Sequence, residues 1–195
     1  MKFTKIPEST FQNVQLNAGV LLSDFDPKTA SLSDGSIVGA TSGGISFAAT
    51  PTYKDMGEDI DNCPKNTKEL KRLESMDIKM SGTFATVTAK SAKMLNAHAD
   101  IDASDASHIV PRTDVKDEDF DDLWWVGDYS DENGEKNGGF CAIYMMNALS
   151  TGGFKIQSED KGKGKFAFEF TAHFSIADQT KVPYEVYVKA GTAEA

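Results

Sequence analysis

The sequence predicts a mainly β protein, a β-sandwich or barrel with one flanking α-helix. Apolar residues recur at every second position in several segments, clusters of Gly, Asn and Asp such as "DENGEKNGG" separate these segments, and only one segment has clear helical spacing. A period of two places successive side chains on opposite faces of a strand, and turn-forming residues mark the strand ends. We expect about seven to nine strands in one domain, which spans residues 1–195.

Three alternating segments lie in the N-terminal half. In "VQLNAGVLL" the apolar side chains from Val14 to Leu22 share one face, and Gln15 and Asn17 lie on the other. The segments "GISFAAT", residues 44–50, and "MDIKMSGTFATVT", residues 76–88, alternate in the same way. Each is typical of a half-buried strand.

The stretch "DKGKGKFAFEFTAHFS", residues 160–175, allows two interpretations. A phosphate-binding loop needs two glycines separated by four residues, then Lys and a hydroxyl residue. Gly162 and Gly164 do not have this spacing, and Phe166 stands where the hydroxyl is needed. The sequence instead predicts a turn followed by a strand. The buried face of that strand is expected to hold Phe166, Phe168, Phe170, Ala172 and Phe174.

Three more segments complete the strand prediction. "GFCAIYMMNAL", residues 139–149, is apolar at successive positions, which is typical of a strand covered on both faces. "LWWVGDY", residues 123–129, is an aromatic strand, and "YEVYV" near the C-terminus alternates again.

Two segments depart from strand periodicity. "TAKSAKMLNAHA" contains good helix formers, with Thr88 placed to cap the helix, so we expect one short helix across the sheet. The segment at about residues 51–75 is charged and has no period of two, although it lies between two clear strands. Long stretches of this kind are functional or disordered, and we expect a long loop here, with a short helix as an alternative within it.

The charge excludes some functions. The chain carries a net charge of −10, whereas a protein that grips duplex DNA neutralises phosphates with basic residues. The sequence shows neither a signal peptide nor a membrane span, and Cys63 and Cys141 do not form a CxxC motif. We expect a cytosolic product with free thiols and no membrane contact.

Candidate chemistry is sparse. "HADIDASDASH" brings together His98, Asp100, Asp102, Asp105 and His108, which could bind a hard cation. It lacks the glycine and the glutamate of an EF-hand loop, and the alternative is a solvated acidic loop. Cys141 lies in an apolar strand, and His173 is expected to be a lone surface histidine. We therefore predict that the protein is not an enzyme and has no catalytic, cofactor-binding or metal-binding residues.

The polar faces of several predicted strands carry unusually short side chains. A solvated face would carry more Lys and Glu, so these faces are expected to meet another subunit or to line a passage. The residues are Gln15, Asn17, Ser46, Ala48, Thr50, Ser81, Thr83, Ala167, Thr171 and Ser175.

Four segments together resemble a known protein family: "IPESTFQNVQLNAGVLL", the stretch from "GATSGGISF" to "MSGTFATVTA", "DLWWVGDYSDENG" and "MNALSTGGFKIQSEDKGKGKFAFEFTAHFS". They are similar to the major tail proteins, the tail tube subunits, of long non-contractile phage and prophage tails from Gram-positive hosts. The resemblance implies a structural virion protein with the tail-tube fold. Homohexameric rings would join their sheets and stack into a tube, and the genome would pass through the electronegative lumen during ejection without specific binding.

The resemblance also implies locations and partners. The protein would lie in the virion tail, and in the host cytoplasm during assembly, with its own copies and the tail terminator and tape measure proteins as partners. The lumen-facing candidates are Glu169, Thr171 and Ser175. The long loop and the terminal arms, which could be mobile, would join stacked rings. The ring-stacking candidates are Lys54, Asp55, Glu58, Asp59, Asp61, Lys65 and Lys68.

Other functions stay open at this point. The same fold would suit the tube of a tail-like bacteriocin or a related secretion machine. A glycan- or receptor-binding β-sandwich would need an exposed aromatic platform, for which Trp124 and Trp125 are the candidates. A third alternative is an acidic enzyme with a pocket in a β-barrel.

Overall fold

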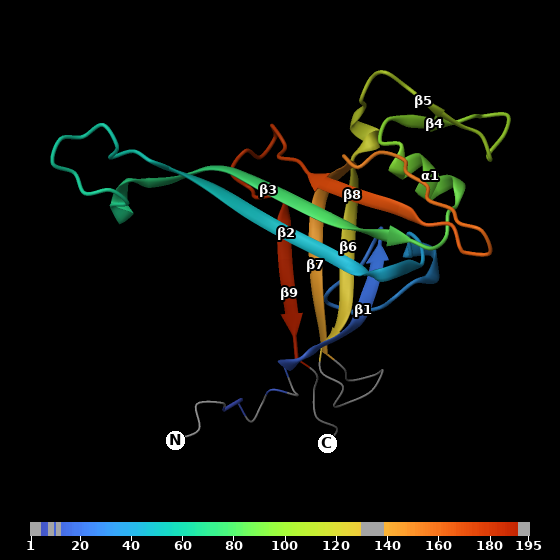
Figure 1. Ribbon diagram of the computed structural model, residues 1–195, viewed down its shortest axis with the longest axis horizontal. Coiled ribbons are helices and arrows are strands. Elements are labelled where there is room, and N and C mark those ends of the chain that lie inside the picture. Colours follow the sequence, from blue (N-terminus) through green and yellow to red (C-terminus); the bar gives the residue numbers. More distant parts are fainter. Residues whose placement is uncertain (1–4, 8–9, 11–12, 130–138, 191–195) are drawn as a thin grey trace.

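The computed structural model describes residues 5–7, 10, 13–129 and 139–190 (Figure 1). The described residues form nine strands and one α-helix, which confirms the mainly β class with one flanking helix. Most of the expected terminal arms and the "DENGEKNGG" turn lie outside the described residues. The strands are β1 (Gln15–Leu22), β2 (Thr41–Asp55), β3 (Lys71–Phe84), β4 (Ala99–Ile101), β5 (Ile109–Pro111), β6 (Asp121–Tyr129), β7 (Gly139–Ser150), β8 (Phe166–Ala172) and β9 (Tyr184–Lys189).

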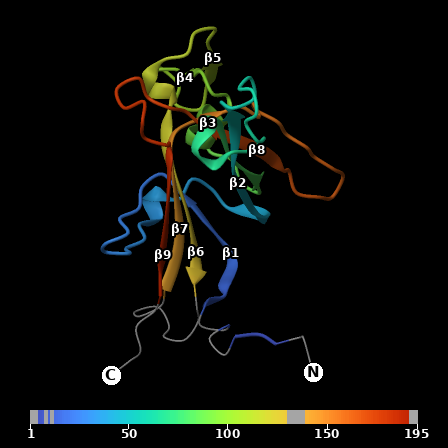
Figure 2. The ribbon, with the colours of Figure 1, turned by 90° about the vertical axis from the view of Figure 1, so that its left-hand side faces the viewer.

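Seven strands form one antiparallel sheet in the order β1-β6-β7-β8-β3-β2, and β9 also pairs with β7. The first half of β7 pairs with β9, and its last residues pair with β8. The sheet therefore divides into two parts that cross (Figure 1). We call β1, β6, β7 and β9 the blade, and β2, β3 and β8 the cross-sheet. Figure 2 shows the blade extending below the cross-sheet.

A β-bulge lies where β7 changes partner. Asp121 pairs with Ala148 and Leu123 pairs with Met145, so two residues of β7 oppose Asp122. Asn147 takes a positive φ of 49°, which Asn tolerates better than most residues. The Asp122 carboxylate accepts hydrogen bonds from the Asn147 N–H at 3.0 Å and from the Tyr144 hydroxyl at 2.5 Å. These contacts hold the bend between the two parts of the sheet.

The main core lies between the cross-sheet and the blade. The alternation predicted for β3 is confirmed, because Ile78, Met80 and Phe84 are fully buried. The turn and strand predicted from residues 160–175 also form: a bridge joins Gln157 to Lys165, and the strand that follows buries alternate residues. The buried side chains of β8 are Phe166, Phe168, Phe170 and Ala172.

The prediction for Phe174 is wrong. Strand β8 ends at Ala172, and Phe174 is 46% exposed in the segment that follows. The period of two in the sequence continues past the point where the strand loses its partners, so periodicity alone did not locate the strand end.

A second cluster covers the other face of the blade. It contains Leu22, Phe25, Trp124, Phe140 and Ala142. Trp124 is buried, and its ring stacks on Tyr144 with centroids 4.3 Å apart. Because β1 is covered on both faces at its end, Leu21 and Leu22 are both buried, on opposite sides. The single apolar face predicted for this strand is therefore wrong, and the register of β1 shifts between Leu16 and Val20.

The predicted helix is confirmed as α1 (Ala89–Leu95). Thr88 caps it: the Ser91 N–H donates to the Thr88 hydroxyl at 3.2 Å, and the Thr88 N–H donates to the Ser91 hydroxyl at 2.8 Å. Leu95 is fully buried, and its carbonyl accepts a hydrogen bond from Ser150 at 2.9 Å, which fastens the helix to the sheet. The short 3₁₀ helices are η2 (Asp34–Ser36), η3 (Lys68–Leu70) and η4 (Asp117–Asp119).

The loop expected at about residues 51–75 is strand at both ends and a connecting segment in the middle. β2 continues to Asp55 and β3 begins at Lys71, so only residues 56–70 connect them. The extension projects from the body as a two-stranded ribbon, which we call the arm, residues 51–75 (Figure 1). Residues 51–54 and 71–75 are all exposed. The strand pattern is short here, because β2 alternates only from Pro51 to Lys54 and a register shift opposite Tyr53 interrupts it in β3, which is why it was not predicted.

Candidate assembly surface

An apolar stripe continues from the core along the arm. Ala49 pairs with Ile78 at the edge of the core, Pro51 pairs with Met76, and Tyr53 pairs with Leu73. The register shifts between Thr52 and Tyr53, which places one extra residue in β3 and returns Leu73 to the face of Tyr53. Tyr53 is 53% exposed and Leu73 is 47% exposed. We call Pro51, Tyr53, Leu73 and Met76 the arm stripe.

The tip of the arm has a defined structure. The Asp55 carboxylate accepts hydrogen bonds from the Gly57 N–H at 2.9 Å and the Asn66 N–H at 2.7 Å. These bonds lower the pKa of Asp55. A Cβ on Gly57 would lie 2.8 Å from Cys63 Sγ and Leu70 Cδ1, so the tip is closely packed at this point. The arm can therefore present its stripe as a preformed surface.

The seven ring-stacking candidates all lie on the arm. Lys54 and Asp55 end β2, and Lys68 begins η3. All except Asp55 are exposed. The four in the connecting turn are Glu58, Asp59, Asp61 and Lys65.

The outer edge of β2 is a second feature of this region. β2 is the last strand of the sheet, and no described strand pairs with its outer edge. Residues 41–53 include no charged side chain. Within these residues, the glycine bulge near Gly43 protects the edge at one end, and Pro51 protects it at the other. Monomeric proteins protect such edges with charge, proline or bulges. The uncharged run was visible in the sequence, but its position at an edge was not.

Two of the three lumen-facing candidates are neighbours. Glu169 and Thr171 lie on the outer face of β8, and Thr151 links them, donating to Glu169 Oε1 at 3.3 Å and lying 2.7 Å from the Thr171 hydroxyl. The register of β3 and β8 also brings Lys79 beside Thr171. The Lys79 Nζ lies 3.9 Å from Glu169 Oε1 and 3.4 Å from Asp77. This face therefore includes one lysine among its acidic and short polar residues.

Ser175 does not share that face. It follows the end of β8 in a turn, where its hydroxyl accepts a hydrogen bond from the Ala177 N–H at 3.2 Å. His173 is not a lone surface histidine either. Its Nδ1 lies 3.2 Å from the Asn147 carbonyl, and its ring meets Phe120 at 5.3 Å between centroids. The sequence could not show that β8 ends beside the bulge of β7.

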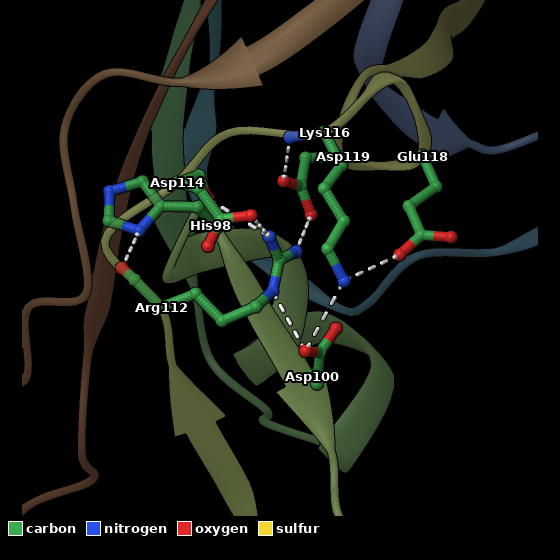
Figure 3. A network of polar contacts seen from close by, with 7 residues as sticks. All are labelled: His98, Asp100, Arg112, Asp114, Lys116, Glu118 and Asp119. Atoms are coloured by element: carbon green, nitrogen blue, oxygen red, sulfur yellow. Dashed lines mark hydrogen bonds and ion pairs between the residues drawn. The ribbon is translucent and has the colours of Figure 1, made fainter.

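Two members of the acidic and histidine-rich segment, His98 and Asp100, contact Arg112 (Figure 3). The guanidinium lies 2.8 Å from Asp100 and 2.6 Å from Asp119, whose carboxylate is fully buried. The Lys116 N–H donates to the other oxygen of Asp119 at 2.8 Å. Burial alone would raise the pKa of Asp119, but these donors hold it below its usual value. The network joins the β4–β5 hairpin to η4.

The other members of the metal candidate have local partners. Asp102 and Asp105 accept hydrogen bonds from Ser104 and Ser107 in their own turns, and His108 Nδ1 lies 3.5 Å from Asp102. Within the part of the chain that the structure describes, no three His, Cys, Asp or Glu residues are arranged to hold a metal ion.

Comparison with known proteins adds no identification. No protein-family model matches the sequence, and no curated protein matches it either. No helix among the residues that the structure describes is long and apolar enough to cross a membrane.

Proposed function

We propose that the protein is a structural subunit that assembles with copies of itself into rings, which stack into the tube of a long phage tail. The observation that carries the proposal is the exposed arm, together with the uncharged outer edge of β2. A two-stranded hairpin is marginally stable alone in water. Contact with another chain would cover the arm and the free edge.

The direction of the arm favours rings and tubes over a simple dimer. The arm projects from one side of the body (Figure 1), and in the proposal a different surface of the next copy receives it, without a reciprocal exchange of arms. Such a contact joins two different patches, so it is heterologous. Heterologous contacts generate closed rings or open helical filaments. A tube of stacked rings combines closed rings with open-ended growth along the tube axis.

The charge supports a conduit for a polyanion. A subunit with a net charge of −10 would give an assembled tube that repels phosphate. A basic wall would bind the genome at each contact through counterion release. In the proposal, Glu169 and Thr171 line the lumen, DNA passes without specific binding, and the terminator and tape measure proteins are the further partners.

The glycan-binding alternative has less support. Trp124 is buried, and Trp125 donates its indole N–H to the Ala18 carbonyl at 3.1 Å. These two side chains therefore do not form an exposed platform together.

Electron microscopy of the purified protein tests the proposal. Wild-type protein should form rings or tubes, and a variant in which a two-residue turn replaces residues 51–76, joining the paired residues Thr50 and Asp77, should stay monomeric and folded. A matched control shortens the exposed turn at residues 158–164, away from the arm, and should still assemble. A wild-type protein that stays monomeric at high concentration and binds glycans would contradict the proposal. Tubes that form inside cells but never enclose DNA would favour a bacteriocin or secretion tube.

A further inference from the structure

The arm stripe has a counterpart on the blade. Within one chain, the inner face of the cross-sheet packs on the blade, where the ring of Phe47 lies 5.6 Å from that of Tyr184 and Ile143 borders the same cluster. This contact ends where the two parts of the sheet cross (Figure 1). Both apolar surfaces continue beyond the crossing, in different directions.

On the blade, the continuing surface lies on β7 and β9. Val186 pairs with Ile143, and Val188 pairs with Cys141, so the four side chains form two adjacent rows on one face. This is the face of Tyr184, which borders the main core. Val186 is 53% exposed and Val188 is 59% exposed, and the other two are half-buried. We call Cys141, Ile143, Val186 and Val188 the blade strip.

The arm stripe is the matching surface. Like the blade strip, it extends the main core past the crossing, with exposed Tyr53 and Leu73 on the core face of β2 and β3. Met76 of the arm stripe also lines an open groove of about 450 Å³, together with Phe174 and Gln179. The two surfaces diverge from the crossing, so one chain cannot bring its own stripe onto its own strip (Figure 1).

We infer that the arm stripe of one copy packs across the blade strip of another copy. The contact would repeat between chains the crossed packing that Phe47 and Tyr184 already make within a chain. The lengths agree, because Pro51 to Tyr53 on the arm and Val186 to Val188 on the blade each cover two residue steps along a strand, about 7 Å. Neither row of the blade strip carries a charge, and on the arm the exposed Lys71 ammonium lies over the Tyr53 ring, 5.3 Å from its centroid, where it can keep its contact with water. This inference rests on the proposed self-assembly and names its receiving surface.

Disulfide trapping between two different variants tests the contact. Both variants carry Cys63→Ser and Cys141→Ala, and the alanine keeps the blade strip apolar. One also carries Leu73→Cys, and the other carries Val186→Cys. Both new positions are exposed, so the variants should fold, which circular dichroism checks. Under mild oxidation a mixture of the two should form covalent heterodimers at least about tenfold faster than either variant forms homodimers, because docking raises the effective concentration of the thiols.

The control partner is Val110→Cys in the same background, since Val110 is 41% exposed on β5, away from the blade strip. Trapping of Leu73→Cys no faster with Val186→Cys than with Val110→Cys overturns the inference. The same samples are viewed by electron microscopy. If tubes form without selective trapping, the proposed function stands and this contact is wrong. If selective trapping gives short oligomers without rings, the contact stands and the proposed tube is wrong.

Discussion

The two halves of the β2–β3 hairpin differ sharply although they share the same strands. At the base, Ile78 and Met80 are fully buried against the blade, whereas in the arm Tyr53 and Leu73 lie half exposed on the same face. The base of the hairpin packs on the rest of its own chain. In the arm the two strands pair along their backbones, but neither face of the pair is covered. The comparison shows that secondary structure extends beyond the core here, and in the proposal a second chain completes the packing.

The largest loss of stability should come from a substitution in the core on which the base of the hairpin packs. Phe168 is 3% exposed and stacks near Phe84 with ring centroids 4.4 Å apart. Phe168→Ala should lower the free energy of unfolding by about 3–5 kcal/mol, because it leaves a cavity. Urea denaturation measures the change. A midpoint equal to that of wild type would mean that the core does not depend on β8.

The Arg112 network should give the next largest effect. Arg112→Met leaves the buried Asp119 carboxylate without its cation, which should cost about 3 kcal/mol. The double variant Arg112→Met/Asp119→Leu should recover part of this loss, because no buried charge remains. Thermal unfolding of the three proteins compares them, and a double variant less stable than the single one would contradict the assigned pairing.

The buried carboxylate of Asp119 predicts that the folded protein loses stability at low pH. The folded-state pKa of Asp119 is lowered despite its burial, and the ordinary value for Asp is about 3.9. Its contribution is therefore complete above about pH 4 and is lost as the pH falls through the lower folded-state pKa. Burial raises the pKa of Asp121, which acts in the opposite direction. Unfolding measured between pH 6 and pH 2 should show this loss in wild type and much less of it in Asp119→Asn, relative to each protein at neutral pH.

Arm substitutions should barely change the stability of the subunit. Leu73→Ala should change the free energy of unfolding by less than about 0.5 kcal/mol, because Leu73 is largely solvated in the single chain. The same substitution should raise the protein concentration needed for assembly, which sedimentation measures. A large loss of subunit stability with unchanged assembly would reverse the proposed roles of arm and base.

Glu169→Lys should have the smallest structural effect and tests the lumen assignment. Glu169 makes a partly exposed ion pair with Lys79 and accepts one hydrogen bond from Thr151, so the substitution should cost no more than about 1 kcal/mol, and tubes should still form. Six added positive charges per ring would attract the genome, so ejection should slow, most of all at low salt. Ejection at the wild-type rate at low ionic strength would move Glu169 off the lumen wall.

The sequence predicted those parts of the fold in which one face of an element is buried. The strands of the core and the cap of α1 followed from periodicity and from Thr88. The arm strands, the end of β8 before Phe174 and the burial of both Leu21 and Leu22 did not, because each depends on which segment covers a face. The partners of His173 and Arg112 likewise depend on contacts between distant segments, which no local pattern records.

Hydrogen exchange of the arm tests the central claim most directly. The amides at residues 52–55 and 71–75 should exchange quickly in the isolated subunit, because the ribbon has no covered face, and should become strongly protected in the assembled protein. Amides near Ile78 should be protected in both states and serve as the internal reference. Arm amides that exchange at the same rate before and after assembly would contradict the claim that a second copy covers the arm.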